Sequence, residues 1–82
     1  MRVELKFFCP ELVGPLRGGV YDVPENAIIS ELLEISGSEC SYRIPDTSLD
    51  YLLFLLNGKS ARPDARLSPG DKIYVLRKVF GG

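Results

Sequence analysis

The chain has 82 residues, of which 45% are apolar and 26% are charged, and this composition is typical of one small globular domain rather than of a disordered or fibrous protein. Ten Lys and Arg residues balance eleven Asp and Glu residues. The chain therefore lacks the basic excess that phosphate neutralisation requires, and nucleic acid is not expected as a partner.

The first part of the sequence predicts two strands joined by a loop. In Val3–Phe8 the side chains alternate between two faces, which is the period of a half-buried strand. Residues 9–19 contain two prolines and three glycines and predict a loop. The segment Val20–Val23 predicts the second strand, so these two strands form a hairpin.

A helix is predicted next, within the stretch PENAIISELLEISG (residues 24–37). Its apolar residues gather on one face at helical spacing, as in a helix that packs on a flat surface. Asn26 is the expected N-cap and Gly37 the expected residue after the helix end.

The following apolar segment, LDYLLFLLNGK (residues 49–59), has two interpretations. Ser48 is able to cap a Leu-rich helix there, but the segment is short and ends in Asn57-Gly58, the strongest signal for a type I′ hairpin turn. We therefore expect a central strand, then a short polar return. The turn SPGD then leads into a last strand, in which Ile73 and Val75 alternate with Tyr74 and Leu76.

The predicted order is strand, strand, helix, strand, short strand, strand. Such a chain reaches an α+β fold in which one main helix packs on one face of a mixed four- or five-stranded sheet. This is the outline of the ubiquitin-like β-grasp fold. We expect a single domain over residues 1–82 that ends in a flexible Gly-Gly tail.

The sequence offers little for catalysis. It has no His, its serines lie mostly in predicted turns, and no glycine-rich phosphate loop precedes a helix. Glu31 and Glu34 are interpreted as a solvated helix face. Cys9 and Cys40 lack CxxC spacing and are expected to be ordinary free thiols, so no bound metal or cofactor is expected. We do not expect an enzyme.

The sequence also lacks signals for membranes or export. Its longest apolar run, Tyr51–Leu56, is far shorter than the ~20 residues of a membrane span. Glu4 and Lys6 interrupt the segment in which a signal peptide needs apolar residues. We expect a cytoplasmic protein with no membrane partner.

Two glycines, Gly81 and Gly82, follow the last predicted strand almost directly. A terminal carboxyl group is ionised at neutral pH, and it is able to attack the α-phosphate of ATP if another protein supplies the nucleotide. Residues without side chains thread a narrow channel, and five residues beyond Arg77 extend on the order of 17 Å. The alternative is that both glycines are a frayed end.

Several motifs in this order resemble the MoaD/ThiS family of sulfur carriers: the opening VELKFF, the helix ENAIISELLE, the hairpin LLNGK, the stretch LSPGDKIYVL and the final Gly-Gly. The resemblance implies that an E1-like adenylating enzyme activates Gly82 with ATP, and that a sulfur donor converts it to a thiocarboxylate for cofactor biosynthesis. Gly81 is the other functional residue that carries over. A large synthase subunit or another sulfur acceptor is then a partner. The stretch FFCPELVG favours the molybdopterin branch over the thiamin branch.

A partner surface is predicted near the tail. Its apolar candidates are Phe8, Tyr74, Leu76, Val79 and Phe80, which either form an exposed docking patch or complete the core. Arg77 and Lys78 either meet acidic groups of a partner or are simply solvated. Two other functions remain open: a protein modifier that is coupled through Gly82 to lysines, and a β-grasp interaction module whose tail does nothing.

Overall fold

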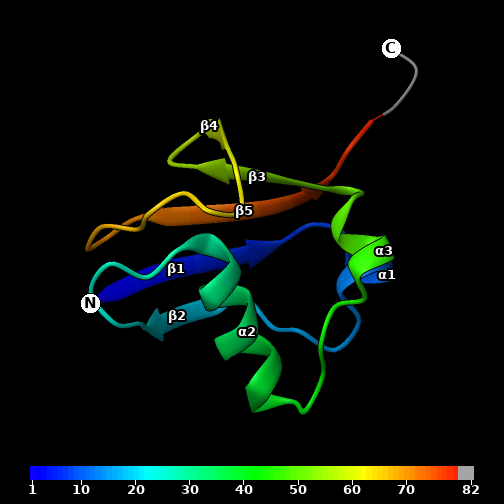
Figure 1. The fold of residues 1–82 in the computed structure, drawn as a ribbon, viewed down its shortest axis with the longest axis horizontal. Coiled ribbons are helices and arrows are strands. Elements are labelled where there is room, and N and C mark those ends of the chain that lie inside the picture. Colours follow the sequence, from blue (N-terminus) through cyan, green and yellow to red (C-terminus); the bar gives the residue numbers. More distant parts are fainter. Residues whose placement is uncertain (80–82) are drawn as a thin grey trace.

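The computed structural model describes residues 1–79, so the predictions for Phe80, Gly81 and Gly82 lie outside the described residues. The strands in this range are β1 (Arg2–Phe7), β2 (Gly19–Asp22), β3 (Leu52–Leu56), β4 (Lys59–Ala61) and β5 (Lys72–Arg77). The helices are α1 (Pro10–Val13), α2 (Ile29–Glu39) and α3 (Asp46–Leu49). Figure 1 shows their arrangement.

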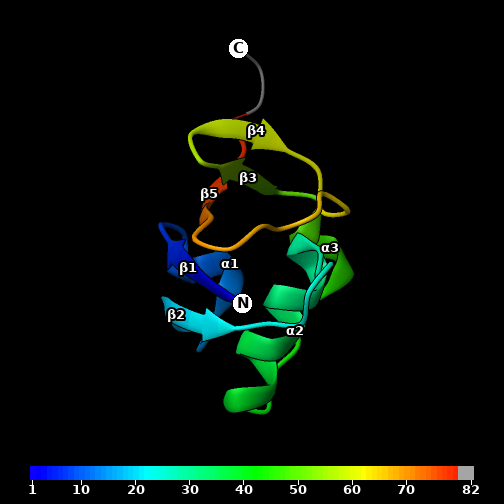
Figure 2. The ribbon, with the colours of Figure 1, turned by 90° about the vertical axis from the view of Figure 1, so that its left-hand side faces the viewer.

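The strands form one mixed sheet in the order β2-β1-β5-β3-β4. The two central strands, β1 and β5, run parallel, and the other neighbouring pairs are antiparallel. Helix α2 crosses one face of this sheet, as both views show (Figures 1 and 2). The prediction of a ubiquitin-like β-grasp fold with one main helix on a mixed sheet is confirmed, and the sheet has five strands.

The core lies between the sheet and α2. Alternate residues of β1, β3 and β5 point toward the helix and are almost completely buried, because a strand places every second side chain on the same face. The main contributors are Val3, Leu5, Leu52, Phe54, Ile73 and Val75 from the strands, and Ile29, Leu32 and Leu33 from α2. The alternation that predicted the first and last strands therefore also identifies their buried face.

The predicted ends of the main helix were wrong. The helix begins after Ile28, whose backbone N–H donates to the Glu31 side chain at 3.3 Å, whereas Asn26 lies before it with a φ of 68°. Gly37 does not end the helix but lies inside it, and the chain turns at Ser41, which has a φ of 52°. Close packing rather than helix termination requires glycine at position 37.

The contact that requires this glycine is with Tyr42. The backbone N–H of Tyr42 donates to the carbonyl oxygen of Gly37 at 2.9 Å, so the chain folds back closely over the helix. A Cβ atom at position 37 would overlap the carbonyl oxygen of Tyr42. Such a contact is far inside van der Waals distance and involves backbone, so it is relieved only by moving the chain.

Two short helices occupy segments that the sequence analysis treated as connections. Pro10 begins α1, as is common for proline in a first helical turn, and the polar connection after α2 contains α3. The segment that follows α3 is a strand rather than a Leu-rich helix, as predicted. Asn57 and Gly58 have φ values of 52° and 87°, which fits the predicted type I′ turn.

The tip of this hairpin is joined to the turn before β5. The Asn57 side-chain amide donates to Asp71 at 2.8 Å and accepts from the backbone N–H of Lys72 at 2.9 Å. The other carboxylate oxygen of Asp71 accepts from the backbone N–H of Ser68 at 2.6 Å. One asparagine thus shapes its own turn and also fixes the start of β5.

We predict that Gly37→Ala lowers the free energy of unfolding by about 1–3 kcal/mol, because the added methyl group overlaps the Tyr42 carbonyl. In an unhindered helix the same change stabilises by up to about 1 kcal/mol. Urea denaturation followed by circular dichroism measures the difference. Ser38→Ala, at the next and exposed position, is the control with little expected effect. An unchanged or increased stability of Gly37→Ala would contradict this account.

Candidate functional site

The face of the sheet that points away from α2 carries a group of apolar side chains. It consists of Phe8, Leu53, Leu55, Tyr74 and Leu76, which we call the apolar patch. Leu55 lies opposite Tyr74 and Leu53 lies opposite Leu76 in the β3–β5 ladder. Side chains that face each other across strands are in contact range, so the patch is continuous over β3 and β5.

Phe8 extends the patch to the other side of β5. Its backbone N–H donates to the carbonyl oxygen of Val75 at 2.9 Å, which holds it beside that strand. The rings of Phe8 and Tyr74 meet edge to face, with centroids 5.5 Å apart, in the geometry that aromatic pairs prefer. Phe8 is nevertheless 50% exposed, so much of its ring is available to a partner.

Positive charge accompanies the apolar patch. The Lys6 ammonium nitrogen lies 5.3 Å from the centroid of the Phe8 ring, within the range of a cation–π contact. Lys6 is the neighbour of Tyr74 in the β1–β5 ladder, and Lys78 is exposed just beyond β5. A partner surface with apolar side chains and carboxylates complements this arrangement.

The chain leaves the sheet beside the patch. After β5 ends at Arg77, the backbone N–H of Lys78 donates to the carbonyl oxygen of Tyr51 at 2.8 Å. The next residue, Val79, is 91% exposed. Lys78 is therefore the last described residue with a hydrogen bond to the body, and we call the segment from Val79 onward the tail. Figure 1 shows the chain leaving the sheet at the end of β5.

The structure separates the residues that the sequence analysis grouped as a partner surface. Phe8, Tyr74 and Leu76 lie together in the apolar patch, on the face away from the core. The guanidinium of Arg77 is turned to α1, where it lies 3.8 Å from the Glu11 carboxylate. Lys78 and Val79 are exposed at the start of the tail.

Sequence reasoning missed Leu53 and Leu55. A signal for them existed, because the run YLLFLL is apolar on both faces whereas one helix covers only one face of a sheet. The second set of apolar residues in such a strand must either face water or meet a partner. The central strand was predicted from the short length of the segment and its Asn57-Gly58 turn, and the second apolar face was not interpreted.

Comparisons with known proteins agree with this fold. No family model matches the chain, and no curated protein matches it in sequence. Among solved structures, small archaeal modifier protein 1 from Haloferax volcanii is 20% identical, with a TM-score of 0.68, over 95% of this chain and 98% of that chain. A putative molybdopterin converting factor subunit 1 from Pyrococcus furiosus is also 20% identical, with a TM-score of 0.67, over 96% of this chain and 99% of that chain.

A third similar structure is a complex of subunits 1 and 2 of the molybdopterin-converting factor from Helicobacter pylori. The match is 26% identical, with a TM-score of 0.56, and covers 100% of both chains. The chain has the ubiquitin-like fold of MoaD-type proteins. The resemblance drawn from the sequence is confirmed at the level of the fold, and it extends over nearly the whole chain.

The remaining reactive groups of this ubiquitin-like body do not form a site. Both cysteines are free, as predicted. Cys9 is buried, and burial together with the nearby Glu11 carboxylate raises the pKa of its thiol, so the thiol stays protonated and unreactive. Within residues 1–79, no group of His, Cys, Asp or Glu side chains is arranged to hold a metal, and no helix has the length and apolarity of a membrane span.

We predict that neighbouring residues of β3 differ sharply in their contribution to stability. Phe54→Ala removes a core side chain and is expected to lower the free energy of unfolding by about 3–5 kcal/mol. Leu55→Thr, in the patch, is expected to cost no more than about 1 kcal/mol, because Leu55 remains partly exposed in the folded state. Chemical denaturation of both variants measures the contrast, and comparable losses would mean that the patch is part of the core.

Proposed function

We propose that this protein is a sulfur carrier whose terminal Gly82 carboxylate is adenylated and then converted to a thiocarboxylate for cofactor biosynthesis. The observation that carries the proposal is the position of the tail. A central strand leads directly from the apolar patch to a segment that begins with a 91% exposed Val79 and ends in Gly-Gly. The similarity to molybdopterin converting factor subunits supports the same function.

In this proposal the body and the tail have separate tasks. The apolar patch and Lys6 dock on a partner, and the tail carries the carboxylate into that partner's active site. The four residues after Lys78 reach at most about 14 Å when fully extended. The reacting atoms of the partner must therefore lie within this distance of its docking surface. Gly81 and Gly82 allow backbone conformations and close approaches that other residues do not.

The chemistry requires an activated acyl group, because a carboxylate is a poor electrophile. An E1-like enzyme supplies ATP, the Gly82 carboxylate attacks its α-phosphate, and pyrophosphate leaves. The terminal sulfur of a persulfide donor then attacks the carbonyl carbon of the acyl-adenylate, and AMP leaves. A thiol reduces the sulfur–sulfur bond that remains and frees the thiocarboxylate.

The partners follow from these steps. The carrier needs an adenylating enzyme, a sulfur donor and a protein that accepts the sulfur. The Helicobacter pylori structure is a complex of subunits 1 and 2, and we propose a large synthase subunit of that kind as the acceptor, in the molybdopterin rather than the thiamin pathway. The carrier itself acts as a co-substrate, binds no cofactor and works in the cytoplasm.

A second candidate function is conjugation to other proteins through Gly82. The observation in its favour is the similarity to a small archaeal modifier protein. Both functions share the activated glycine and differ in the acceptor, which is sulfur for the carrier and a lysine amine for the modifier. Conjugation therefore produces adducts of higher mass on denaturing gels.

We predict that the intact protein gains the mass difference between sulfur and oxygen when incubated with ATP, its adenylating enzyme, a persulfide donor and a thiol. Top-down mass spectrometry is expected to place this gain on Gly82. Deletion of Gly82 is expected to abolish the gain without changing the fold. A protein that never gains this mass but forms lysine adducts is a modifier, and one that does neither is an interaction module.

We predict that Leu55→Asp weakens docking to the adenylating enzyme without impairing the chemistry of the tail. Docking buries only the exposed remainder of Leu55, which contributes less than the about 1.5–3 kcal/mol of a fully buried Leu side chain, but the variant also buries an unpaired carboxylate. The KM for the carrier is therefore expected to rise at least about tenfold, with kcat nearly unchanged. Asn26→Asp adds the same charge at an exposed position before α2 and is the matched control. Equal effects of the two variants on KM would contradict the docking role of the patch.

A further inference from the structure

The free edge of β2 is a second feature of the sheet that the proposed function does not use. β2 is the last strand of the sheet on the side opposite β4 (Figure 1). Its outer backbone groups can be identified from its pairing with β1. In an antiparallel ladder, pairs that exchange hydrogen bonds alternate with pairs that do not, so one known hydrogen-bonded pair fixes all the others.

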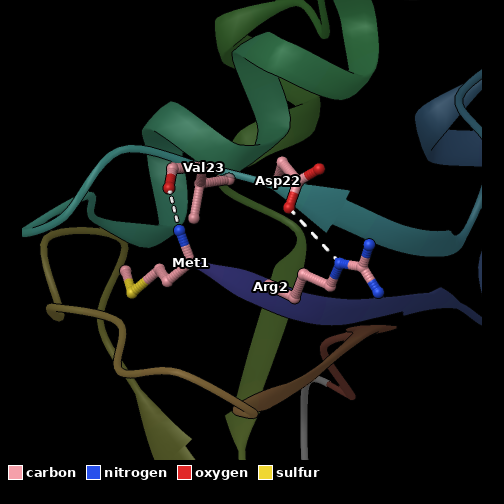
Figure 3. Close-up of polar contacts among 4 residues, drawn as sticks. All are labelled: Met1, Arg2, Asp22 and Val23. Carbon is pink, nitrogen blue, oxygen red and sulfur yellow. Dashed lines mark hydrogen bonds and ion pairs between the residues drawn. The ribbon is translucent and has the colours of Figure 1, made fainter.

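The known pair is Met1 with Val23. The backbone N–H of Val23 donates to the carbonyl oxygen of Met1, and the amino nitrogen of Met1 donates to the carbonyl oxygen of Val23, both at 2.8 Å. Figure 3 shows the second of these bonds. Two residues further on, Val3 and Tyr21 form the next hydrogen-bonded pair in the same register. Asp22 lies between these two pairs, and Val20 lies beyond the second one.

Asp22 and Val20 therefore direct their backbone N–H and C=O groups away from β1, toward the open edge. The hydrogen bonds of β1 support this assignment. Glu4, the partner of Val20, directs its backbone N–H away from β2 and donates it to the carbonyl oxygen of Asp71 at 2.9 Å. The Val20 side chain is 67% exposed. The edge thus offers two donors, two acceptors and an apolar side chain.

The two edges of the sheet differ in their protection. β4 has only three residues, begins with Lys59 and is followed by Arg62 and Pro63, and charged residues and proline are common means of blocking an edge. β2 has four residues and one charged side chain, Asp22, which is paired with Arg2; it contains no Lys, Arg or Pro, and its pairs with β1 are consecutive, without a bulge. The edge of β2 remains suited to accepting another strand.

A hollow lies on the helix side of the sheet, between the loop that precedes β2 and the last part of α2. It has a volume of about 380 Å³ and is lined by Pro15, Arg17, Ser36, Glu39 and Cys40. Tyr21 of β2 reaches the same place, because its hydroxyl donates to the carbonyl oxygen of Arg17 and lies 3.0 Å from the Ser36 hydroxyl. Side chains of an added strand that point toward the helix side have space there.

The charges around the edge indicate what kind of strand fits. Asp22 forms an exposed ion pair with Arg2 at 3.6 Å (Figure 3). The other charged groups at this edge are Glu4 opposite Val20, Glu25 just after β2, Glu39 and Arg17 in the hollow, and the Met1 ammonium group beside Val23. The four carboxylates outnumber the three cations by one, so a basic strand is favoured over an acidic one. A second copy of this chain would bring acidic edge against acidic edge.

We propose that the β2 edge binds an extended segment of a partner protein by β-strand addition, and that this segment alternates apolar residues with basic ones. Its backbone pairs with Val20 and Asp22. The backbone pairing provides affinity and the alternate side chains provide specificity, as in other strand-addition complexes. This site is separate from the apolar patch and the tail, so the protein holds a second partner while Gly82 reacts.

The test uses the full chain and a capped hexapeptide in which valine and lysine alternate. We expect the backbone amides of Val20 and Asp22 to shift and to exchange more slowly with solvent in nuclear magnetic resonance spectra as peptide is added. A peptide methylated at every backbone nitrogen has no N–H group on either edge with which to pair as a strand, and it is expected to cause neither effect.

Val20→Pro removes one outward N–H without breaking a β1–β2 hydrogen bond, because proline is tolerated where the N–H of an edge strand faces solvent. It is expected to weaken peptide binding about tenfold. Val20→Thr keeps the N–H and the branched side chain and is the matched control. Thiocarboxylate formation on Gly82 is expected to be unchanged in both variants, which separates this test from that of the proposed function.

Three results would overturn the proposal. Equal binding of the methylated and unmethylated peptides would show that no strand pairing occurs. Shifts confined to Phe8, Tyr74 and Leu55 would place the peptide on the apolar patch. Protection of Val20 and Asp22 that depends on protein concentration, without peptide, would identify a second copy of the chain as the occupant.

Discussion

The structure depends on the packing of one helix against one face of a five-stranded sheet. α2 buries the inward side chains of β1, β3 and β5, and residues such as Leu5, Ile73 and Val75 are almost completely removed from water. Within residues 1–79, the other two helices, α1 and α3, have four residues each and are too short to cover the other face. The outward face is therefore left to water or to other molecules, and so are the sheet edges, which a helix packed on one face does not cover.

How much of the fold the sequence predicts depends on how local the determining interactions are. Alternation in β1 and β5 and the turn at Asn57-Gly58 are local, and each was predicted correctly. The end of α2 is not local: Gly37 has the residue type of a helix terminator, but it is required by the carbonyl of Tyr42, which folds back over it. This return of the chain cannot be recognised from the pattern of residue types around Gly37.

The candidate site was likewise predicted only where it depends on local sequence patterns. Alternation along β5 predicted that Tyr74 and Leu76 share a face, whereas their contact with Leu53 and Leu55 depends on which strands become neighbours. Arg77 was grouped with the docking residues because it is close to the tail in sequence. The structure also places its guanidinium 3.8 Å from Glu11 of the short helix α1, which the sequence did not reveal. Tertiary placement, rather than residue type, determines both arrangements.

The two similar classes of protein, archaeal modifiers and molybdopterin converting factor subunits, share one body. In the proposed function and in its alternative, the reaction takes place at the end of the tail, so the packing of the body would be the same for a sulfur acceptor and for a lysine acceptor. Under either proposal the partner that receives the tail supplies the acceptor, and the apolar patch would select that partner.

The position of β5 has a mechanical consequence. The strand that continues into the tail is paired on both sides, in parallel with β1 and in antiparallel with β3. A pulling force on the tail loads the hydrogen bonds of both ladders in shear, so that many bonds must yield together rather than one after another. A machine that grips the tail and pulls thus meets its greatest resistance at the first strand it reaches.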